Sequence, residues 1–268
     1  MGVVLYERAD GIALLRLNRP ARLNAMTMEL VLELTRWLDV AVRDGNRVVV
    51  LTGAGRGFCS GADMKGDEPP VADEHEWTDD PARSPQAAYH GLILKLYELD
   101  LPVIAAINGV AVGGGQSLAL AADIRIAAAS ATFGCVFIQR GLTSLDSGNG
   151  WLLPRIVGHG IAAELSLTGR TFDAAEALRI GLVSRVVEDD ELLPAALETA
   201  RLIAANAPSA VWMTKRGMHA EAEIPSFRAA IELERRTQRL ADLTGERREA
   251  VAAFRERRAP DYGGAPAF

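Results

Sequence analysis

Apolar residues follow two different patterns along the chain, and together these patterns predict a mixed α/β fold. Near the N-terminus, apolar stretches on either side of Asp10-Gly11 predict a β-hairpin closed by a tight turn. Continuous apolar runs at residues 47–52, 102–107 and 124–128 are typical of strands that are buried on both faces, with helices between them. We therefore expect an opening hairpin and then a sheet that helices cover.

The first of these helices is predicted directly after the hairpin. Thr27 has the side-chain oxygen that an N-cap requires, and helical spacing then continues to Val42. Leu30, Leu34 and Leu38 fall on one face of this helix. This apolar face is expected to cover the sheet.

The C-terminal part of the chain is predicted to be mainly helical. A short helix is expected in the middle of the chain, over residues 116–122. Towards the C-terminus, a helix is expected over 192–205 and a long amphipathic helix over 225–258. We expect a main domain over residues 1–200 and a C-terminal helical region over 201–268. That region would pack on another part of the protein or at a subunit interface.

Composition and charge narrow the function. The chain has 268 residues with 29 basic and 35 acidic side chains, and its net charge of −6 argues against a nucleic-acid-binding face. A small-molecule partner is therefore expected. No window is long and apolar enough to span a membrane. Cys59 and Cys135 are too few for a disulfide framework and lack metal-ligand spacing, which predicts core positions, no metal and a cytoplasmic location.

An acidic, proline-rich stretch interrupts the regular pattern at residues 67–85. Its composition predicts an exposed loop, since neither a strand nor a helix tolerates so many prolines and charges. The stretch is equally compatible with a mobile lid and with a solvated connector.

The first glycine-rich segment covers residues 51–64 and follows a predicted strand. It is not a dinucleotide-binding loop, because that fingerprint would need glycine at Phe58 and a helix directly afterwards. Glycines this dense let the backbone approach another group closely and leave the amide of Ala62 free to donate a hydrogen bond.

The second glycine-rich segment is a strand that passes through Gly113-Gly114-Gly115 into a helix. Helix N-termini present unpaired N–H groups and the positive end of the helix dipole, so this turn is suited to an anion or oxyanion. The stretch around Ser117 also has the form of a nucleophile elbow, but the run of three glycines argues against that interpretation.

In this order the two segments resemble the crotonase family, also called the enoyl-CoA hydratase/isomerase family. The resemblance covers most of the chain, and further matching motifs are Asn18-Arg19-Pro20, Leu23-Asn24-Ala25, Asp123-Ile124-Arg125-Ile126-Ala127, Phe133-Gly134, Leu153-Pro154-Arg155, Gly181-Leu182-Val183 and Lys215. It implies the crotonase (ClpP-like) α/β fold of repeated ββα units with a C-terminal helical region, assembled as a homotrimer or a dimer of trimers.

The same resemblance implies a site for an acyl-CoA thioester, the kind of substrate used in fatty acid metabolism. The N–H groups of Ala62 and Gly114 would form an oxyanion hole for the thioester carbonyl. The residues that would line the substrate and coenzyme A pocket are Arg22, Leu23, Ala25, Ala62, Asp63, Met64, Lys65, Gly114 and Phe137. Beyond the coenzyme A of the substrate, no cofactor is implied.

Two positions depart from the pattern of the family's hydratases. Those enzymes carry glutamates where this chain has Ser117 and Phe137. A hydratase needs one group to activate water and another to protonate the α-carbon, and neither serine nor phenylalanine can replace a carboxylate in these roles. An isomerase is therefore favoured over a hydratase.

Asp146 is the candidate acid/base for such a reaction. Some isomerases of the family bear a catalytic aspartate in this loop, and the neighbouring Phe137 and Leu145 would desolvate the carboxylate and raise its proton affinity. The alternative is an aspartate that only closes a Ser/Gly turn.

His90 opens a second possibility, because the coenzyme-A-linked dehalogenases of the family place a histidine base and a nucleophilic aspartate at similar positions. His90 with Asp146 could then hydrolyse a CoA thioester in a dehalogenase-like reaction. A non-catalytic acyl-CoA-binding protein is a third possibility. Phe254 and the arginines around it could complete the coenzyme A pocket, or could simply form a solvated helix face.

Overall fold

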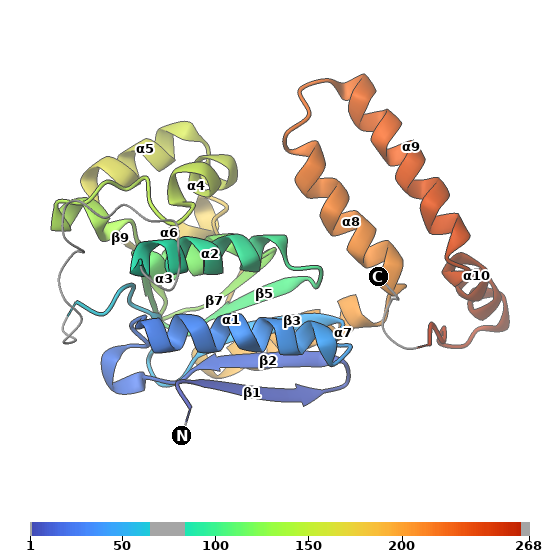
Figure 1. Ribbon diagram of the computed structural model, residues 1–268, viewed down its shortest axis with the longest axis horizontal. Helices are drawn as coiled ribbons and strands as arrows, with labels where there is room; N and C mark the ends of the chain where they lie inside the picture. The colour runs from blue at the N-terminus through green and yellow to red at the C-terminus, as the bar shows by residue number, and fades with distance from the viewer. Residues whose placement is uncertain (1, 65–83, 264–268) are drawn as a thin grey trace.

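Two sheets form the centre of the protein, which the computed structural model describes over residues 2–64 and 84–263 (Figure 1). The larger sheet has the strand order β1-β2-β3-β5-β7-β10. The bounds of its strands are β1 (Val4–Ala9), β2 (Ile12–Leu17), β3 (Val48–Gly53), β5 (Val103–Ile107), β7 (Ile124–Ala128) and β10 (Arg185–Val187). Strand β1 pairs antiparallel with β2, and the other pairs in this sheet are parallel.

Successive residues of a central strand point to opposite faces of the sheet, and both faces are buried. This explains why the sequence of these strands is continuously apolar. In β3, Val49 and Leu51 enter a core shared with α1 (Met28–Arg43) and α2 (Pro85–Glu98), while Val48 and Val50 enter a second core beneath α7 (Leu192–Ala204). Both faces of the sheet are therefore covered, as the sequence predicted.

The smaller sheet has the order β4-β6-β8-β9 and brings the two glycine-rich segments together. Its strands are β4 (Gly57–Cys59), β6 (Val110–Val112), β8 (Thr132–Gly134) and β9 (Thr171–Asp173). Strands β4 and β6 run parallel with Cys59 opposite Ala111, so the turns that follow them leave the same edge of the sheet.

The opening hairpin and the first helix match their predictions. Asp10 and Gly11 have φ values of 53° and 72°, which the tight turn between β1 and β2 requires. The hydroxyl of Thr27 accepts a hydrogen bond from the N–H of Leu30 at 3.3 Å and caps α1. Helix α2, which carries His90, is capped in the same way by Ser84.

Other helices differ from the predictions. The helix expected over 225–258 is two helices, α9 (Phe227–Leu243) and α10 (Glu246–Glu256), because the chain turns at Gly245 with a φ of 82°. The short helix expected from residue 116 is α3 (Gly114–Ala121). Four helices were not predicted: α4 (Asn149–Val157), α5 (His159–Thr168), α6 (Ala174–Arg179) and α8 (Pro208–Glu221).

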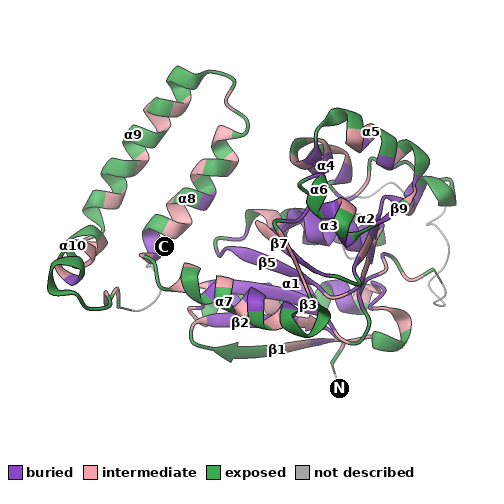
Figure 2. Cartoon of the chain, turned by 180° about the vertical axis from the view of Figure 1, so that it is seen from behind, coloured by how far each residue is buried: buried purple, intermediate pink, exposed green. Residues whose placement is uncertain are grey.

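Helices α8, α9 and α10 form an arm that projects from the sheets (Figures 1 and 2). The domain boundary expected after residue 200 falls inside α7, which packs on the larger sheet, and the arm begins with α8 at Pro208. No described residue of α9 is buried. Large apolar side chains therefore remain exposed on the arm, among them Phe227 and Phe254.

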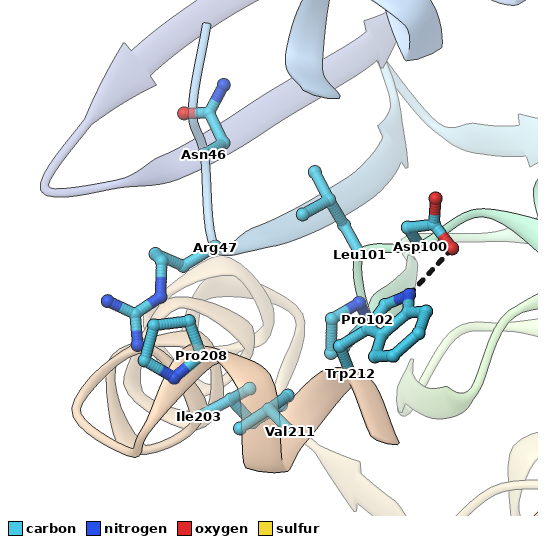
Figure 3. A pocket seen from close by; sticks show the side chains of 9 residues that line it. All are labelled: Asn46, Arg47, Asp100, Leu101, Pro102, Ile203, Pro208, Val211 and Trp212. Carbon is cyan, nitrogen blue, oxygen red and sulfur yellow. Dashed lines mark hydrogen bonds between the residues drawn. The ribbon is translucent and has the colours of Figure 1, made fainter. Parts of the chain in front are cut away.

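The arm joins the core through a polar contact and a small pocket at the base of α8. Lys215 is buried and its Nζ donates to the carbonyl oxygen of Leu101 at 3.0 Å and to Asp123 Oδ2 at 2.8 Å. In the pocket beside it, the indole N–H of Trp212 donates to Asp100 at 2.8 Å (Figure 3). The buried contacts of Lys215 and the exposed hydrogen bond of Trp212 thus fix where the arm leaves the body of the protein.

The acidic segment, a membrane-spanning helix and a metal site were each considered from the sequence. The acidic segment lies outside the described residues except for Ser84 and Pro85, and Lys65 also lies outside them. Within the described ranges, no helix has the length and apolarity needed to cross a membrane. No cluster of metal-ligating side chains was found in the same ranges.

Candidate active site

The turns after β4 and β6 lie in direct contact, and glycine makes this contact possible. Gly61 has a φ of 85°, and a Cβ atom there would lie 3.1 Å from the carbonyl oxygen of Val112 and 3.2 Å from the nitrogen of Gly114. A Cβ on Gly115 would overlap the carbonyl oxygen of Cys59 at 1.9 Å. Side chains at these positions would force the two turns apart.

Pairing with Met26 directs the N–H of Ala62 away from the neighbouring strand. Met26 N donates to the carbonyl oxygen of Gly61 at 2.8 Å, and Asp63 N donates to the carbonyl oxygen of Met26 at 2.9 Å. In a parallel bridge of this kind the central residue, Ala62, keeps its own N–H for another partner. Ala62 is also exposed, so a ligand can reach its N–H.

Gly114 supplies the second N–H because it is the first residue of α3. The first N–H groups of a helix have no carbonyl partner within the helix, and they carry the positive end of the helix dipole. In the part of the chain that the structure describes, neither the Ala62 nor the Gly114 N–H donates to an acceptor. The two donors predicted from the sequence are thus on adjoining turns and available.

Buried polar contacts hold the Ala62 turn in place. Asp63 has only 4% of its side chain exposed and binds Arg19 at 2.9 Å and Arg22 at 2.6 Å. Asn24 is fully buried, and its side-chain amide donates to the carbonyl oxygen of Gly57 at 2.7 Å. The segment before α1 is thereby fastened to the turn, which limits the movement of the Ala62 donor.

The residues expected to line the coenzyme A pocket differ in their exposure. Ala62, Met64 and Arg22 reach the surface next to the turn, whereas Ala25 and the Asp63 carboxylate are buried. Leu23 is partly buried and adopts a left-handed conformation with a φ of 49°. Its carbonyl oxygen accepts from the N–H of Ser60 at 3.0 Å, so Leu23 helps to fasten the turn.

The two positions without glutamates lie close to the Gly114 turn. Ser117 is fully buried in α3, and its hydroxyl has no hydrogen-bond partner among the described residues. Phe137 is buried as well, and its Cε1 lies 4.0 Å from the position that a Cβ on Gly113 would take. Neither buried residue beside the turn offers the carboxylate that a hydratase has.

Asp146 lies in the loop before α4, and its nearest described partner is His90. His90 Nε2 lies 2.6 Å from Asp146 Oδ1, and the Ser147 hydroxyl donates to the same oxygen at 3.3 Å. The apolar surrounding expected for Asp146 is wrong at Leu145, whose side chain is 77% exposed. The group that lies against Asp146 is polar instead.

Two short paths join the Asp146 loop to the paired turns. On one side, Tyr89 precedes His90 in α2, and its hydroxyl donates to the carbonyl oxygen of Met26 at 3.3 Å, the residue paired with Ala62. On the other side, Asn149 N donates to the carbonyl oxygen of Asp146 at 2.9 Å, and the Asn149 side chain accepts from Gln116 in the first turn of α3 at 3.1 Å.

Sequence reasoning missed these four connecting residues, Met26, Tyr89, Gln116 and Asn149, because none carries catalytic chemistry of its own. Their contacts join segments that are distant in sequence, so no local sequence pattern predicts these contacts. The contacts bring His90 and Asp146 together and tie both to the elements that carry Ala62 and Gly114.

Other candidate residues lie apart from this group. Phe254 is 85% exposed on α10 and belongs to the arm. Burial raises the pKa of the Cys59 thiol to about 12 and also raises the pKa of Cys135, so both remain protonated core residues. The nucleophile-elbow interpretation of Ser117 fails in this structure because its hydroxyl is buried and bonded to no base among the described residues.

Two available N–H groups on adjoining turns form the arrangement that enzymes use to stabilise an oxyanion. A model of the family described as enoyl-CoA hydratase/isomerase matches residues 7–265. The chain belongs to this family. The resemblance noted from the glycine-rich segments is thereby confirmed.

Relatives and solved structures agree with this assignment. The chain is 43% identical over 267 residues to a probable enoyl-CoA hydratase of Mycobacterium bovis, covering 98% of this chain and 93% of that one. It is 38% identical over 265 residues to the 1,2-epoxyphenylacetyl-CoA isomerase of Escherichia coli, covering 98% and 99%. A crystal structure of a probable enoyl-CoA hydratase/isomerase from Mycobacterium abscessus superposes with a TM-score of 0.87 at 39% identity, covering 97% and 98%. The predicted crotonase fold is confirmed.

Proposed function

We propose that the protein shifts the double bond of an enoyl-CoA, with Asp146 as the acid/base and the N–H groups of Ala62 and Gly114 as the oxyanion hole. The observation that carries this proposal is the position of Asp146, which the Asn149–Gln116 contact ties to the helix that begins at Gly114. This contact supports a role for the Asp146 loop in the same site as the Gly114 donor.

The chemistry follows from these groups. The Asp146 carboxylate accepts a proton from carbon, and the electron pair of the broken C–H bond moves through the conjugated system onto the thioester oxygen. The two N–H groups bind this oxygen, and each such donor contributes about 3 kcal/mol to lowering the barrier. Asp146 then returns a proton to a different carbon, the thioester carbonyl re-forms, and the double bond has moved.

The residues at the two hydratase positions support isomerisation over hydration. Addition of water needs a base to activate the water molecule, and the buried Ser117 and Phe137 provide none. One acid/base that serves both carbons is enough for a double-bond shift. The similarity to the Escherichia coli isomerase supports the same choice, although the relatives also include hydratases.

One observation favours a second candidate function, dehalogenase-like hydrolysis of a CoA thioester. The 2.6 Å contact between His90 and Asp146 unites the two side chains that such a reaction would use as base and nucleophile. The same contact occupies Oδ1 of Asp146 and leaves Oδ2 for attack. A non-catalytic acyl-CoA-binding protein would use the same pocket without either group.

The remaining parts of the proposal concern partners and location. The partner is an acyl-CoA thioester, with no nucleic acid, membrane, metal or redox cofactor taking part in the reaction. We propose a homotrimer or a dimer of trimers, supported by the exposed apolar side chains on the arm. A cytoplasmic location is supported by the two free, buried cysteines.

The test compares wild type with Asp146→Asn on short and long trans-2- and cis-3-enoyl-CoA. We expect the exchange to lower kcat by about 100-fold or more, the usual contribution of a general acid/base. Asp190→Asn is the matched control, because Asp190 is exposed in the turn directly before α7. Equal turnover by Asp146→Asn would remove Asp146 from the mechanism. Release of free coenzyme A, or of halide from a halogenated acyl-CoA, would favour the second function, and turnover of no thioester would favour the binding role.

A further inference from the structure

His90 connects the proposed acid/base to bulk water. Its Nε2 lies 2.6 Å from Asp146 Oδ1, within the range of a charge-assisted hydrogen bond. The side chain of His90 is nevertheless 48% exposed, whereas that of Asp146 is 23% exposed. One imidazole therefore touches the carboxylate and the solvent at the same time.

Few described side chains beside Asp146 can carry a proton to or from its partly exposed carboxylate. Ser147 also contacts Oδ1, but Ser147 is buried and its hydroxyl cannot carry a proton outward by itself. The loop is packed against α2, where Gly148 lies beside Ile93, so the carboxylate has a fixed position relative to His90. Among the described residues around Asp146, the imidazole is thus the exposed group that can both accept and donate a proton.

We propose that His90 exchanges the proton held by Asp146 with solvent, so that the hydrogen taken from the substrate is largely replaced by a solvent hydrogen before it is returned. This inference rests on the proposed function, since it assumes that Asp146 moves the substrate proton. It adds that the double-bond shift proceeds with incorporation of solvent hydrogen. A site with an isolated carboxylate would return the original hydrogen more often.

Asp146 accepts a proton from carbon and becomes neutral, and the substrate becomes an enolate held by the two N–H groups. The exposed imidazole exchanges its hydrogen with water and shifts to the tautomer that carries this hydrogen on Nδ1. Nε2 then accepts the proton of the neutral acid, which gives a carboxylate and an imidazolium. The exposed imidazolium exchanges its N–H hydrogens with water, and a solvent-derived proton returns through Nε2 to Asp146 and then to carbon. No oxidant, reductant or co-reactant other than water takes part.

The experiment is isomerisation in D₂O with mass spectrometry of the product at low conversion. The measured quantity is the fraction of product molecules that gained deuterium, because this fraction reports competition between exchange and return of the proton. For the wild type we expect substantial incorporation. In His90→Gln, which can still donate a hydrogen bond to Asp146 but cannot shuttle protons, the fraction should fall severalfold. His159→Gln is the matched control, because His159 is exposed on α5.

A second variant separates proton relay from structural support. Imidazole added to His90→Ala should restore deuterium incorporation in a concentration-dependent way, since free imidazole can occupy the exposed space and exchange protons. A merely structural role for His90 would lower turnover without changing the fraction of deuterated product, and imidazole would then have no effect on that fraction.

The outcomes distinguish this inference from the proposed function. Unchanged incorporation in His90→Gln and His90→Ala, or a wild type that returns the original hydrogen, would overturn the relay and leave the proposed isomerisation intact. Full activity of Asp146→Asn would overturn the proposed function, and the relay with it. Loss of incorporation in both His90 variants, with recovery by imidazole, would support the relay.

Discussion

At the scale of single residues, the candidate site depends on main-chain atoms as much as on side chains. The N–H groups of Ala62 and Gly114 point to no acceptor among the described residues, and this availability follows from the glycines beside them. A sequence shows glycines directly, so these two donors could be predicted. It does not show hydrogen bonds between distant residues, so the contact between His90 and Asp146 became visible only in the structure.

The Gly114 donor can be tested with one pair of variants. Gly114→Pro removes the N–H at the first position of α3, where helices accept proline. Gly114→Ala keeps the N–H but adds the same Cβ, which lies 2.4 Å from the flexible end of Met26 and obliges that side chain to move. We expect kcat/KM of the proline variant to be about 100-fold below that of the alanine variant, equal to about 3 kcal/mol of lost oxyanion stabilisation.

Equal kcat/KM values for Gly114→Pro and Gly114→Ala would contradict the oxyanion role of Gly114. Thermal unfolding of both variants serves as the control. If their melting temperatures are similar, a difference in kcat/KM reports the lost N–H group and not a loss of folded protein.

At the scale of elements, the N-cap signal in the sequence identified α1 but not every capped helix, since α6 is capped by Asp173 and was missed. The N-cap threonine of α1 could be found because its side chain replaces a missing helical hydrogen bond. Helices α4, α5, α6 and α8 were missed. Helix α4 follows a glycine-rich loop and contains Pro154, and both features are usual signs of irregular structure.

The cap of α1 predicts a defined change in stability. Thr27→Ala removes the acceptor for the N–H of Leu30 and should lower the free energy of unfolding by about 1 kcal/mol, whereas Thr27→Ser should retain most of it. Urea denaturation followed by circular dichroism measures both variants. A Thr27→Ala protein as stable as the serine variant would show that the cap contributes nothing.

At the scale of the whole molecule, a buried ion pair joins the arm to the core. Burial alone would raise the pKa of Asp123, but hydrogen bonds and charge from His219 and Lys215 outweigh it and hold that pKa below its usual range. Burial lowers the pKa of Lys215, and the carboxylate of Asp123 opposes this shift. His219 also stacks on Tyr97 with ring centroids 4.1 Å apart, so the contact area at this junction is both polar and aromatic.

The lowered pKa of Asp123 predicts a loss of stability in acid. Because the unfolded carboxylate binds protons at a higher pH than the folded one, this contribution is present above the unfolded pKa of about 4 and is lost as the pH falls below it. Asp123→Asn should cost about 3 kcal/mol at neutral pH, since it leaves the Lys215 charge buried without its partner. The free energy of unfolding of the variant should also depend less on pH below about 4.

Chemical unfolding at a series of pH values measures these effects. The control is Asp123→Asn combined with Lys215→Met, which removes both charges and should recover part of the loss. If the stability of Asp123→Asn fell in acid as steeply as that of the wild type, other carboxylates would be responsible for the loss of stability in acid.

The arm gives a prediction about assembly. Phe227, Leu243 and Phe254 are each at least 80% exposed, and apolar groups in such numbers are usual at interfaces between subunits. Phe254→Asp should shift the proposed trimer or hexamer towards smaller species, since burial of one phenylalanine contributes about 2 kcal/mol. Analytical ultracentrifugation over a range of concentrations measures this shift. Gln238→Asp adds the same charge at an exposed polar position, and an equal effect of both changes would argue against an apolar interface.

The sequence by itself determined the parts of this protein that depend on local physics. The hairpin at Asp10-Gly11, the capped helix after Thr27, the buried strands and the two glycine-rich turns each follow from backbone conformation or from burial of neighbouring residues. The absence of carboxylates at Ser117 and Phe137 can likewise be read directly, and it limits the chemistry.

Only the tertiary structure decided which distant groups meet. Pairing of β4 with β6 places the Ala62 and Gly114 turns at one edge, and packing of the 141–148 loop on α2 sets Asp146 against His90 instead of against Leu145. The physical reason is that contacts across the chain depend on how whole elements pack. The path from His90 to solvent is a property of that packing and of no single segment.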